Sequence, residues 1–208
     1  MKRIVFASNN QGKVREVASI LAPLDIVVIP QSEYFVPAVE ETGLSFVENA
    51  IIKARHAARH TALPSIADDS GLEVDALDGE PGIYSARYAG PDGDDDANNE
   101  KLLNELLDAG PGPHTARYQC LMVFMRHALD PTPVICQGAW EGEITDNPRG
   151  KNGFGYDPLF LAPALGLTAA ELEPDEKNRV SHRGKALRQL ADVLCERYLS
   201  DRANVPLR

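Results

Sequence analysis

The sequence predicts an α/β protein, and three observations carry this prediction. Residues 3–29 alternate between a strand pattern and a helix pattern, and residues 44–60 have the periodicity of an amphipathic helix. Residues 115–144 contain two long runs rich in Val, Ile, Cys, Tyr and Phe. With 208 residues, the chain is long enough to bury a core as one domain or as two lobes that share a sheet.

Composition narrows the classes of function. Hydrophobic residues make up 43% and charged residues 25% of the chain, as in ordinary soluble domains. A formal net charge of −10 argues against a general surface for nucleic acid or anionic membrane, but it does not exclude a local anion pocket. The apolar run at residues 4–7 is too short for a signal-peptide core. Cys120, Cys136 and Cys195 lack zinc or redox spacing, which favours reduced thiols and a cytoplasmic location.

The first strand, Arg3–Ala7, runs directly into the polar segment 8–13. A helix with Val17 and Leu21 on its apolar side follows. A strand, a small polar turn and a helix start form an anion site, because free backbone N–H groups and the helix dipole converge there. Lys13 adds a charge that can reach a phosphate. The alternative is that Ser8 or Asn10 simply caps a surface helix.

A second strand at 25–29 completes a β-α-β unit, and the helix over residues 44–60 comes next. On a helical wheel its predicted core face consists of Leu44, Val47, Ile51, Ala54 and Ala58. A second stripe carries Phe46, Asn49, Lys53, His56 and His60. This second stripe is either a solvated face or part of a site. Glu41, just before the helix, either complements the helix dipole or binds a metal.

Residues 65–74 place adjacent carboxylates, Asp68 and Asp69, after a short apolar run and before Ser70 and Gly71. We expect a buried strand that ends in a tight turn, followed by a second short strand. Side chains alternate along a strand, so one carboxylate would face a cleft while the other braces backbone. The alternative is an ordinary Asp-Asp-Ser-Gly turn.

The middle of the chain is less informative. Residues 81–88 form a loop with aromatic and basic members, and residues 91–100 are rich in Asp. The spacing does not fit an EF-hand, so we expect a solvated loop and an acidic start to a helix over 97–107. Residues 115–125 and 134–144 predict an antiparallel hairpin.

The last third supplies further candidates. The two glycines around Phe154 free its ring to stack on a ligand, although the ring could equally plug the core. A capped turn at 168–176 leads to Lys177. Ser181 is the expected N-cap of the final helix, whose first turn holds His182 and Arg183. Cations at that end oppose the helix dipole, which suggests an anionic or carbonyl-bearing partner.

Taken together in order, six blocks closely resemble the inosine/xanthosine triphosphate pyrophosphatases. The likeness covers roughly residues 3–197, and six ordered blocks are far more specific than any one of them. The blocks are Ser8–Lys13, Glu40–Gly43 with Glu48–Ala54, Ala67–Leu72, Pro81–Arg87, Gly153–Pro158 and Ser181–Ala186. Departures from the family pattern are Lys151-Asn152, Tyr118 and the C-terminal tail.

The resemblance implies an elongated two-lobed α/β fold, with a central mixed β-sheet flanked by helices and an active-site cleft between the lobes. Residues 1–197 would form this single domain, and residues 198–208 a loose tail. It also implies a homodimer. The charge and the cysteines add the expectation of a cytoplasmic protein without nucleic-acid or membrane partners. The implied reaction is Mg²⁺-dependent hydrolysis of ITP, dITP or XTP to the monophosphate and pyrophosphate.

The resemblance assigns roles to particular residues. Asp69 is the expected general base and, with Glu41, the metal ligand, while Asp68 and Asn49 are possible supports. The remaining expected contacts are to the substrate: Ser8, Asn9, Asn10, Gln11, Gly12, Lys13, Lys53, Ser70, Phe154, Gly155, Tyr156, Asp157, Lys177, His182 and Arg183. Phe154 would stack on the base, and Arg183 with a protonated His182 would donate to the 6-keto group and so disfavour ATP. GTP also carries a 6-keto group, so its exclusion must come from contacts at the 2-position, which the sequence does not identify.

Two other functions compete with this interpretation. A non-catalytic purine nucleotide sensor could use the same pocket, but Asp69 and Glu41 would then have no purpose. A glycosidase would use paired acids, but adjacent Asp68 and Asp69 are poorly placed to flank a sugar bond from two sides.

Overall fold

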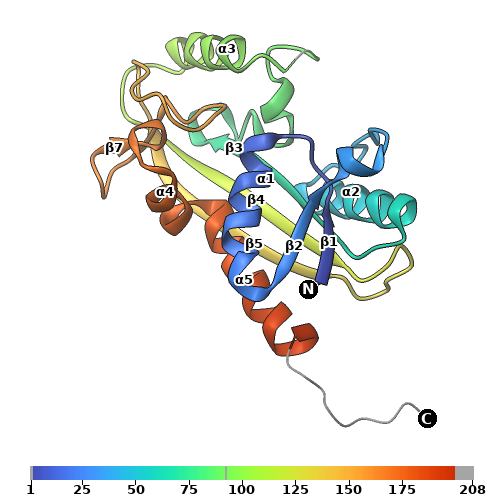
Figure 1. Ribbon diagram of the computed structural model, residues 1–208. Coiled ribbons are helices and arrows are strands. Elements are labelled where there is room, and N and C mark those ends of the chain that lie inside the picture. Colours follow the sequence, from blue (N-terminus) through green and yellow to red (C-terminus); the bar gives the residue numbers. More distant parts are fainter. Residues whose placement is uncertain (1, 92, 200–208) are drawn as a thin grey trace, which may run out of the picture.

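The computed structural model describes residues 2–91 and 93–199, with the side chain of Leu199 left out. Within these ranges the chain forms one mixed sheet in the order β2-β1-β3-β4-β5-β6-β7 (Figure 1). Strands β2, β1 and β3 are parallel, and the remaining pairs are antiparallel. The strands are β1 (Lys2–Phe6), β2 (Ile26–Pro30), β3 (Ser65–Val74), β4 (His114–Met125), β5 (Val134–Ile144), β6 (Phe160–Ala162) and β7 (Leu167–Thr168). The predicted α/β class is confirmed.

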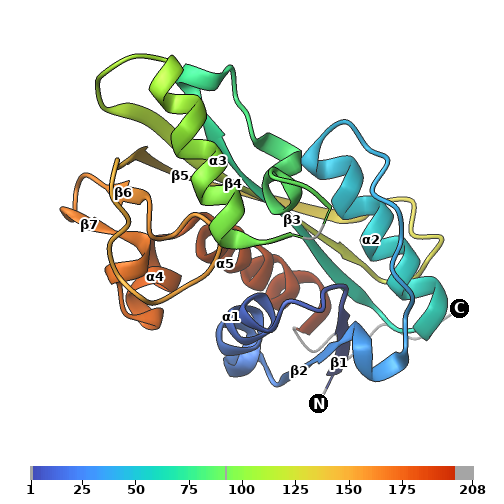
Figure 2. The same ribbon diagram turned by 90° about the horizontal axis from the view of Figure 1, so that it is seen from above.

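Helices cover both faces of this sheet, as Figure 2 shows from above. Helices α1 and α5 pack on one face, and α2 packs on the other against β1, β3 and β4. The α-helices are α1 (Gln11–Leu21), α2 (Phe46–Thr61), α3 (Asp95–Asp108), α4 (Pro174–Val180) and α5 (His182–Leu194). None of the helices in the described ranges is long and apolar enough to cross a membrane.

The alternation of side chains along β3 decides which of its residues face which helix. Ile66 belongs to the apolar cluster of α1 and α5, whereas Ala67 belongs to that of α2. Successive side chains on a strand point to opposite faces, so this alternation continues to the two carboxylates that follow. Asp68 therefore faces α1 and α5, and Asp69 faces α2.

Two predicted N-caps are confirmed. Asn10 and Ser181 cap α1 and α5, and each side chain accepts a hydrogen bond from the backbone of the first turn. Ser45, which was not predicted as a cap, does the same for α2. The predicted β-α-β unit and the predicted hairpin are both present.

Two predictions about individual elements are wrong. First, β3 has no turn at the Asp-Asp pair, because it pairs with β4 continuously from Ser65 to Val74. Gly71 serves close packing instead: a Cβ there would lie 2.2 Å from the carbonyl oxygen of Gly82. Second, Leu44 lies before α2 and is 86% exposed, so it is not a core residue. The buried face of α2 comprises Asn49, Ala50, Ala54, Ala57 and Ala58.

The expected acidic start of a helix is present. Asp94 caps α3, which begins at Asp95, two residues before the expected start, while Asp92 lies outside the described residues. Most of the expected tail, residues 200–208, also lies outside them. Tyr198, within the short helical turn Cys195–Leu199, packs against Phe124 with a ring-centroid distance of 5.3 Å.

Candidate active site

Asp69 sits in a small acidic cluster on the α2 face. The Nζ atom of Lys53 lies 2.6 Å from Asp69 Oδ1 and 3.2 Å from Glu41 Oε2. The other oxygen, Asp69 Oδ2, is buried without a hydrogen-bond partner in the described part of the chain. Burial raises the pKa of Asp69 to about 6 against the opposing effect of Lys53. A carboxylate with one free oxygen and a pKa near neutrality is suited to accept a proton.

Asp68 has very different surroundings on the opposite face. Its Oδ2 atom lies 3.0 Å from Lys13 Nζ and accepts hydrogen bonds from Arg183 Nη2, at 3.0 Å, and from Ser70 Oγ, at 2.8 Å. Burial alone would raise the pKa of Asp68, but Lys13 and Arg183 hold it well below its usual range. Asp68 is therefore a permanent anion that positions two cations, not a group that braces backbone.

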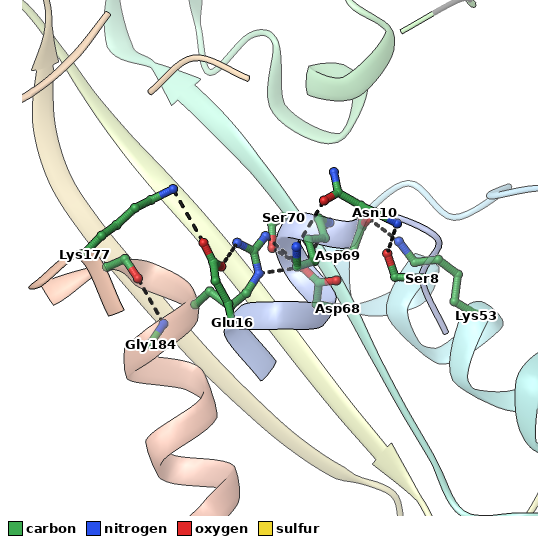
Figure 3. Close-up of polar contacts among 12 residues, drawn as sticks. Ser8, Asn10, Glu16, Lys53, Asp68, Asp69, Ser70, Lys177 and Gly184 are labelled. Carbon is green, nitrogen blue, oxygen red and sulfur yellow. Dashed lines mark hydrogen bonds and ion pairs between the residues drawn. The ribbon is translucent and has the colours of Figure 1, made fainter. Parts of the chain in front are cut away.

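Glu16, which the sequence did not single out, connects these cations to a second buried pair. Its Oε2 atom accepts a hydrogen bond from Arg183 Nη1 at 2.7 Å, and its Oε1 atom lies 3.6 Å from Lys177 Nζ. Lys177 also donates to Asp157 Oδ2 at 2.5 Å. Figure 3 shows Glu16 between Lys177 and the two aspartates, with Lys53 on the opposite side of the aspartates from Lys177. No sequence motif marked Glu16, because it lies within the ordinary polar pattern of α1.

Most of the predicted substrate residues line one pocket beside Asp68. These are Asn10, Lys13, Ser70, Phe154, Gly155, Tyr156, Asp157, Lys177, His182 and Arg183. Gly12 lines an adjoining hollow on the other side of Phe154. Ser8 lies next to this region and accepts a hydrogen bond from the Asn10 backbone at 3.1 Å. Asn9 and Gln11 are exposed at the start of α1. Glu41, Lys53 and Asp69 are not among the lining residues and form the separate cluster described above.

The Phe154 ring is held among cations. Lys177 Nζ lies 4.8 Å from the ring centroid, and the guanidinium carbon of Arg183 lies 5.6 Å from it. A Cβ at Gly12 would lie 3.0 Å from the ring, so any larger residue there would require the ring to shift. The ring is thus a wall of the pocket and not a plug of the main core.

Helix α3 holds the loop that carries Phe154. Asp95 Oδ2 accepts a hydrogen bond from the Gly155 backbone N–H at 2.7 Å, and Asn99 Nδ2 donates to the Gly155 carbonyl at 3.0 Å. The expectation that the acidic segment before α3 is only solvated is therefore wrong for Asp95. Sequence reasoning missed both residues, because a contact 60 positions away leaves no local signal.

His182 is buried and uncharged. Its ring stacks on Tyr118 with centroids 4.6 Å apart and an interplanar angle of 14°. Burial, Arg183 and Lys177 lower the pKa of His182 well below its usual value, so the expected protonated form is wrong. Its Nδ1 atom has no hydrogen-bond partner within residues 2–91 and 93–199. A neutral imidazole can donate or accept there.

The residues at the α2 face fit a hard divalent cation. Among the described residues, no group of three or more His, Cys, Asp or Glu side chains could enclose a metal. Mg²⁺ does not need such an enclosure, because it commonly binds through one or two carboxylates and keeps water and phosphate ligands. Glu41 and Asp69 supply two carboxylates, and Asp69 Oδ2 is an orphaned oxygen. Asn49 supports the cluster, since its Oδ1 accepts the Gly43 backbone N–H at 2.8 Å near Glu41.

Comparisons with known proteins show the family to which this chain belongs. A model of the Ham1 family matches residues 4–193. A dITP/XTP pyrophosphatase of Thioalkalivibrio sulfidiphilus is 61% identical over 92% of this chain and 98% of its own length, and one of Vibrio cholerae is 56% identical over 94% and 98%. A solved HAM1 protein from Coxiella burnetii superposes with a TM-score of 0.88 at 53% identity, covering 94% of this chain and 100% of that one.

Proposed function

The chain belongs to the Ham1 family, and from this premise we propose that it is a nucleoside-triphosphate pyrophosphatase acting on non-standard purines. The substrates are dITP, ITP and XTP, and the products are the nucleoside monophosphate and pyrophosphate. The observation that carries this proposal is that neighbouring residues of β3 join the two sites: Asp69 contacts Lys53 in the carboxylate cluster, and Ser70 lines the pocket that also contains Lys13, Lys177 and Arg183. Such a pair of sites suits a metal-bound triphosphate.

Asp69 is the proposed general base. With a pKa of about 6, it is mostly ionised at pH 7 and can accept a proton from the attacking water. Glu41 and Asp69 would hold Mg²⁺, which when bound offsets negative charge on the phosphoryl oxygens. The segment 8–13 and Lys53 supply backbone and ammonium donors for the triphosphate.

The base end of the pocket is proposed to lie at Phe154, with Lys177 close to the same ring. Arg183 has five N–H groups, of which three donate to Asp68 and Glu16, so two remain for a ligand. A 6-keto purine presents an acceptor to these donors, whereas adenine presents an amino group. Rejection of ATP follows because donors would be left unpaired in a buried site.

Product analysis tests this proposal directly. The protein is incubated with dITP and Mg²⁺, and the phosphate products are identified, with Asp69→Asn as the matched control. Pyrophosphate and monophosphate in equal amounts support the proposal. Release of orthophosphate would point to a different bond, and tight binding of dITP without turnover would favour the sensor function instead.

We also propose that the enzyme is a two-lobed domain over residues 1–197, with the cleft between the lobes, and that it acts as a homodimer in the cytoplasm. The resemblance of the six sequence blocks supports these points. Sedimentation equilibrium measures the oligomeric state, and a monomer at micromolar concentration would contradict the dimer.

A further inference from the structure

Lys53 holds the two carboxylates that the proposed metal needs. Its ammonium bridges Glu41 Oε2 and Asp69 Oδ1, and the three side chains are 14%, 29% and 10% exposed. Two partly buried carboxylates this close together would repel each other without a cation between them. In this structure Lys53 supplies that cation.

The same contacts make Lys53 a competitor of a divalent ion. A metal bound between Glu41 and Asp69 would lie beside the Lys53 ammonium, which is 3.2 and 2.6 Å from their oxygens, so the two cations would repel each other. The displaced ammonium then needs another anionic partner, because an unpaired charge in a partly buried site is costly. Lysine has a flexible stem and can turn to a nearby anion.

A triphosphate is the anion that the proposed function provides. We propose that Lys53 is an internal counter-ion, which pairs with Glu41 and Asp69 in the empty enzyme and moves to the triphosphate when nucleotide and metal bind together. This inference rests on the proposed function. It couples the two ligands, since nucleotide removes the competitor of the metal, and by linkage each ligand raises the affinity for the other.

Metal binding without nucleotide tests this exchange. Mn²⁺, as a spectroscopic probe for Mg²⁺, is titrated at pH 8 into the wild-type chain and into Lys53→Met, and free Mn²⁺ is measured by electron paramagnetic resonance. Loss of the competitor should tighten Mn²⁺ binding by about tenfold or more. Lys53→Arg keeps the charge and should bind Mn²⁺ as weakly as wild type.

Lys13→Met is the matched control for a general loss of positive charge. Lys13 pairs with Asp68 on the opposite face and contacts neither Glu41 nor Asp69 in the described ion pairs. Its substitution should change Mn²⁺ affinity by less than about threefold. Equal tightening in both variants, or unchanged affinity in Lys53→Met, would overturn the proposal.

Thermal unfolding gives a second measurement that does not depend on activity. The rise in melting temperature with added Mg²⁺ should be larger for Lys53→Met than for wild type, and Glu41→Gln should abolish it in the Lys53→Met background. A rise no larger than that of wild type would overturn the proposal. Because these experiments contain no nucleotide, such a result leaves the pyrophosphatase assignment to be judged by its own product analysis.

Discussion

Asp68 and Asp69 are neighbours in β3, yet their side chains lie on opposite faces of the sheet and their pKa values move in opposite directions. Asp68 pairs with Lys13 and Arg183, which hold its pKa well below the usual range, whereas burial raises the pKa of Asp69 to about 6. Environments that shift the pKa values of two adjacent acids in opposite directions give the two acids different roles. One acid is a fixed anion, and the other can exchange a proton.

The first prediction concerns Asp69→Asn. Because Asp69 is the proposed base, kcat for dITP should fall by about 10²-fold or more. Its raised pKa means that the folded state disfavours the charged form, so the neutral amide should leave stability unchanged or slightly higher. Steady-state kinetics and thermal unfolding measure the two effects. Near-normal turnover would contradict the assignment of Asp69 as base.

The adjacent substitution, Asp68→Asn, should act mainly on stability. It leaves Lys13 and Arg183 without their anion at a side chain that is 1% exposed, and breaking a buried pair costs roughly 3–5 kcal/mol. The lowered pKa of Asp68 also predicts how stability depends on pH. Its contribution to the free energy of unfolding is complete above the unfolded-state pKa of about 4, and it is lost progressively as the pH falls below that pKa. Urea unfolding at pH 7 and pH 3 should therefore show a smaller acid-induced loss in Asp68→Asn than in wild type.

The residues that sequence reasoning placed correctly depend on local signals. The N-caps Asn10 and Ser181 and the β-α-β order follow from the chemistry of a few consecutive residues. Gly71 was interpreted as a turn residue, but a glycine is required there because the backbone of Gly82, 11 positions later in the chain, packs against it. Glu16, Asp95 and Asn99 were missed because their partners are distant in sequence.

The charge state of His182 also could not be predicted from the sequence alone. Its position in the first turn of α5 predicted a cation, but burial and two neighbouring cations make the neutral ring the stable form. Burial of a single ring depends on the whole fold. The sequence pattern therefore predicted where His182 lies along the chain but not its protonation state.

A third prediction follows from the pKa of Asp69. The base must be ionised to accept a proton, so kcat/KM for dITP should rise about tenfold per pH unit below pH 6 and level off above it. The profile of kcat/KM reports the free enzyme, which is the state described here. A profile that stays flat between pH 5 and pH 7 would exclude Asp69 as the group that titrates.

The contact between α3 and Gly155 yields a fourth prediction. Asp95→Ala removes the acceptor of the Gly155 N–H and loosens the loop that carries Phe154, which should raise KM for dITP several-fold with a smaller change in kcat. Asp96→Ala is the control, because it removes a charge from the same turn without a described hydrogen bond to Gly155. Equal kinetic effects in both variants would show that the charge of the turn matters and the contact does not.

The last prediction concerns the choice of base at Arg183. Arg183→Ala would leave Asp68 and Glu16 without a buried cation, so the more informative change is Arg183→Lys, which keeps the charge. Lysine lacks the planar fork that can hold both carboxylates and still present two N–H groups to a 6-keto oxygen. The ratio of kcat/KM for ITP over ATP should therefore fall, mainly because ITP becomes a poorer substrate. If both substrates lose activity equally, Arg183 acts only by positioning Asp68 and Glu16, and base selection lies elsewhere in the pocket.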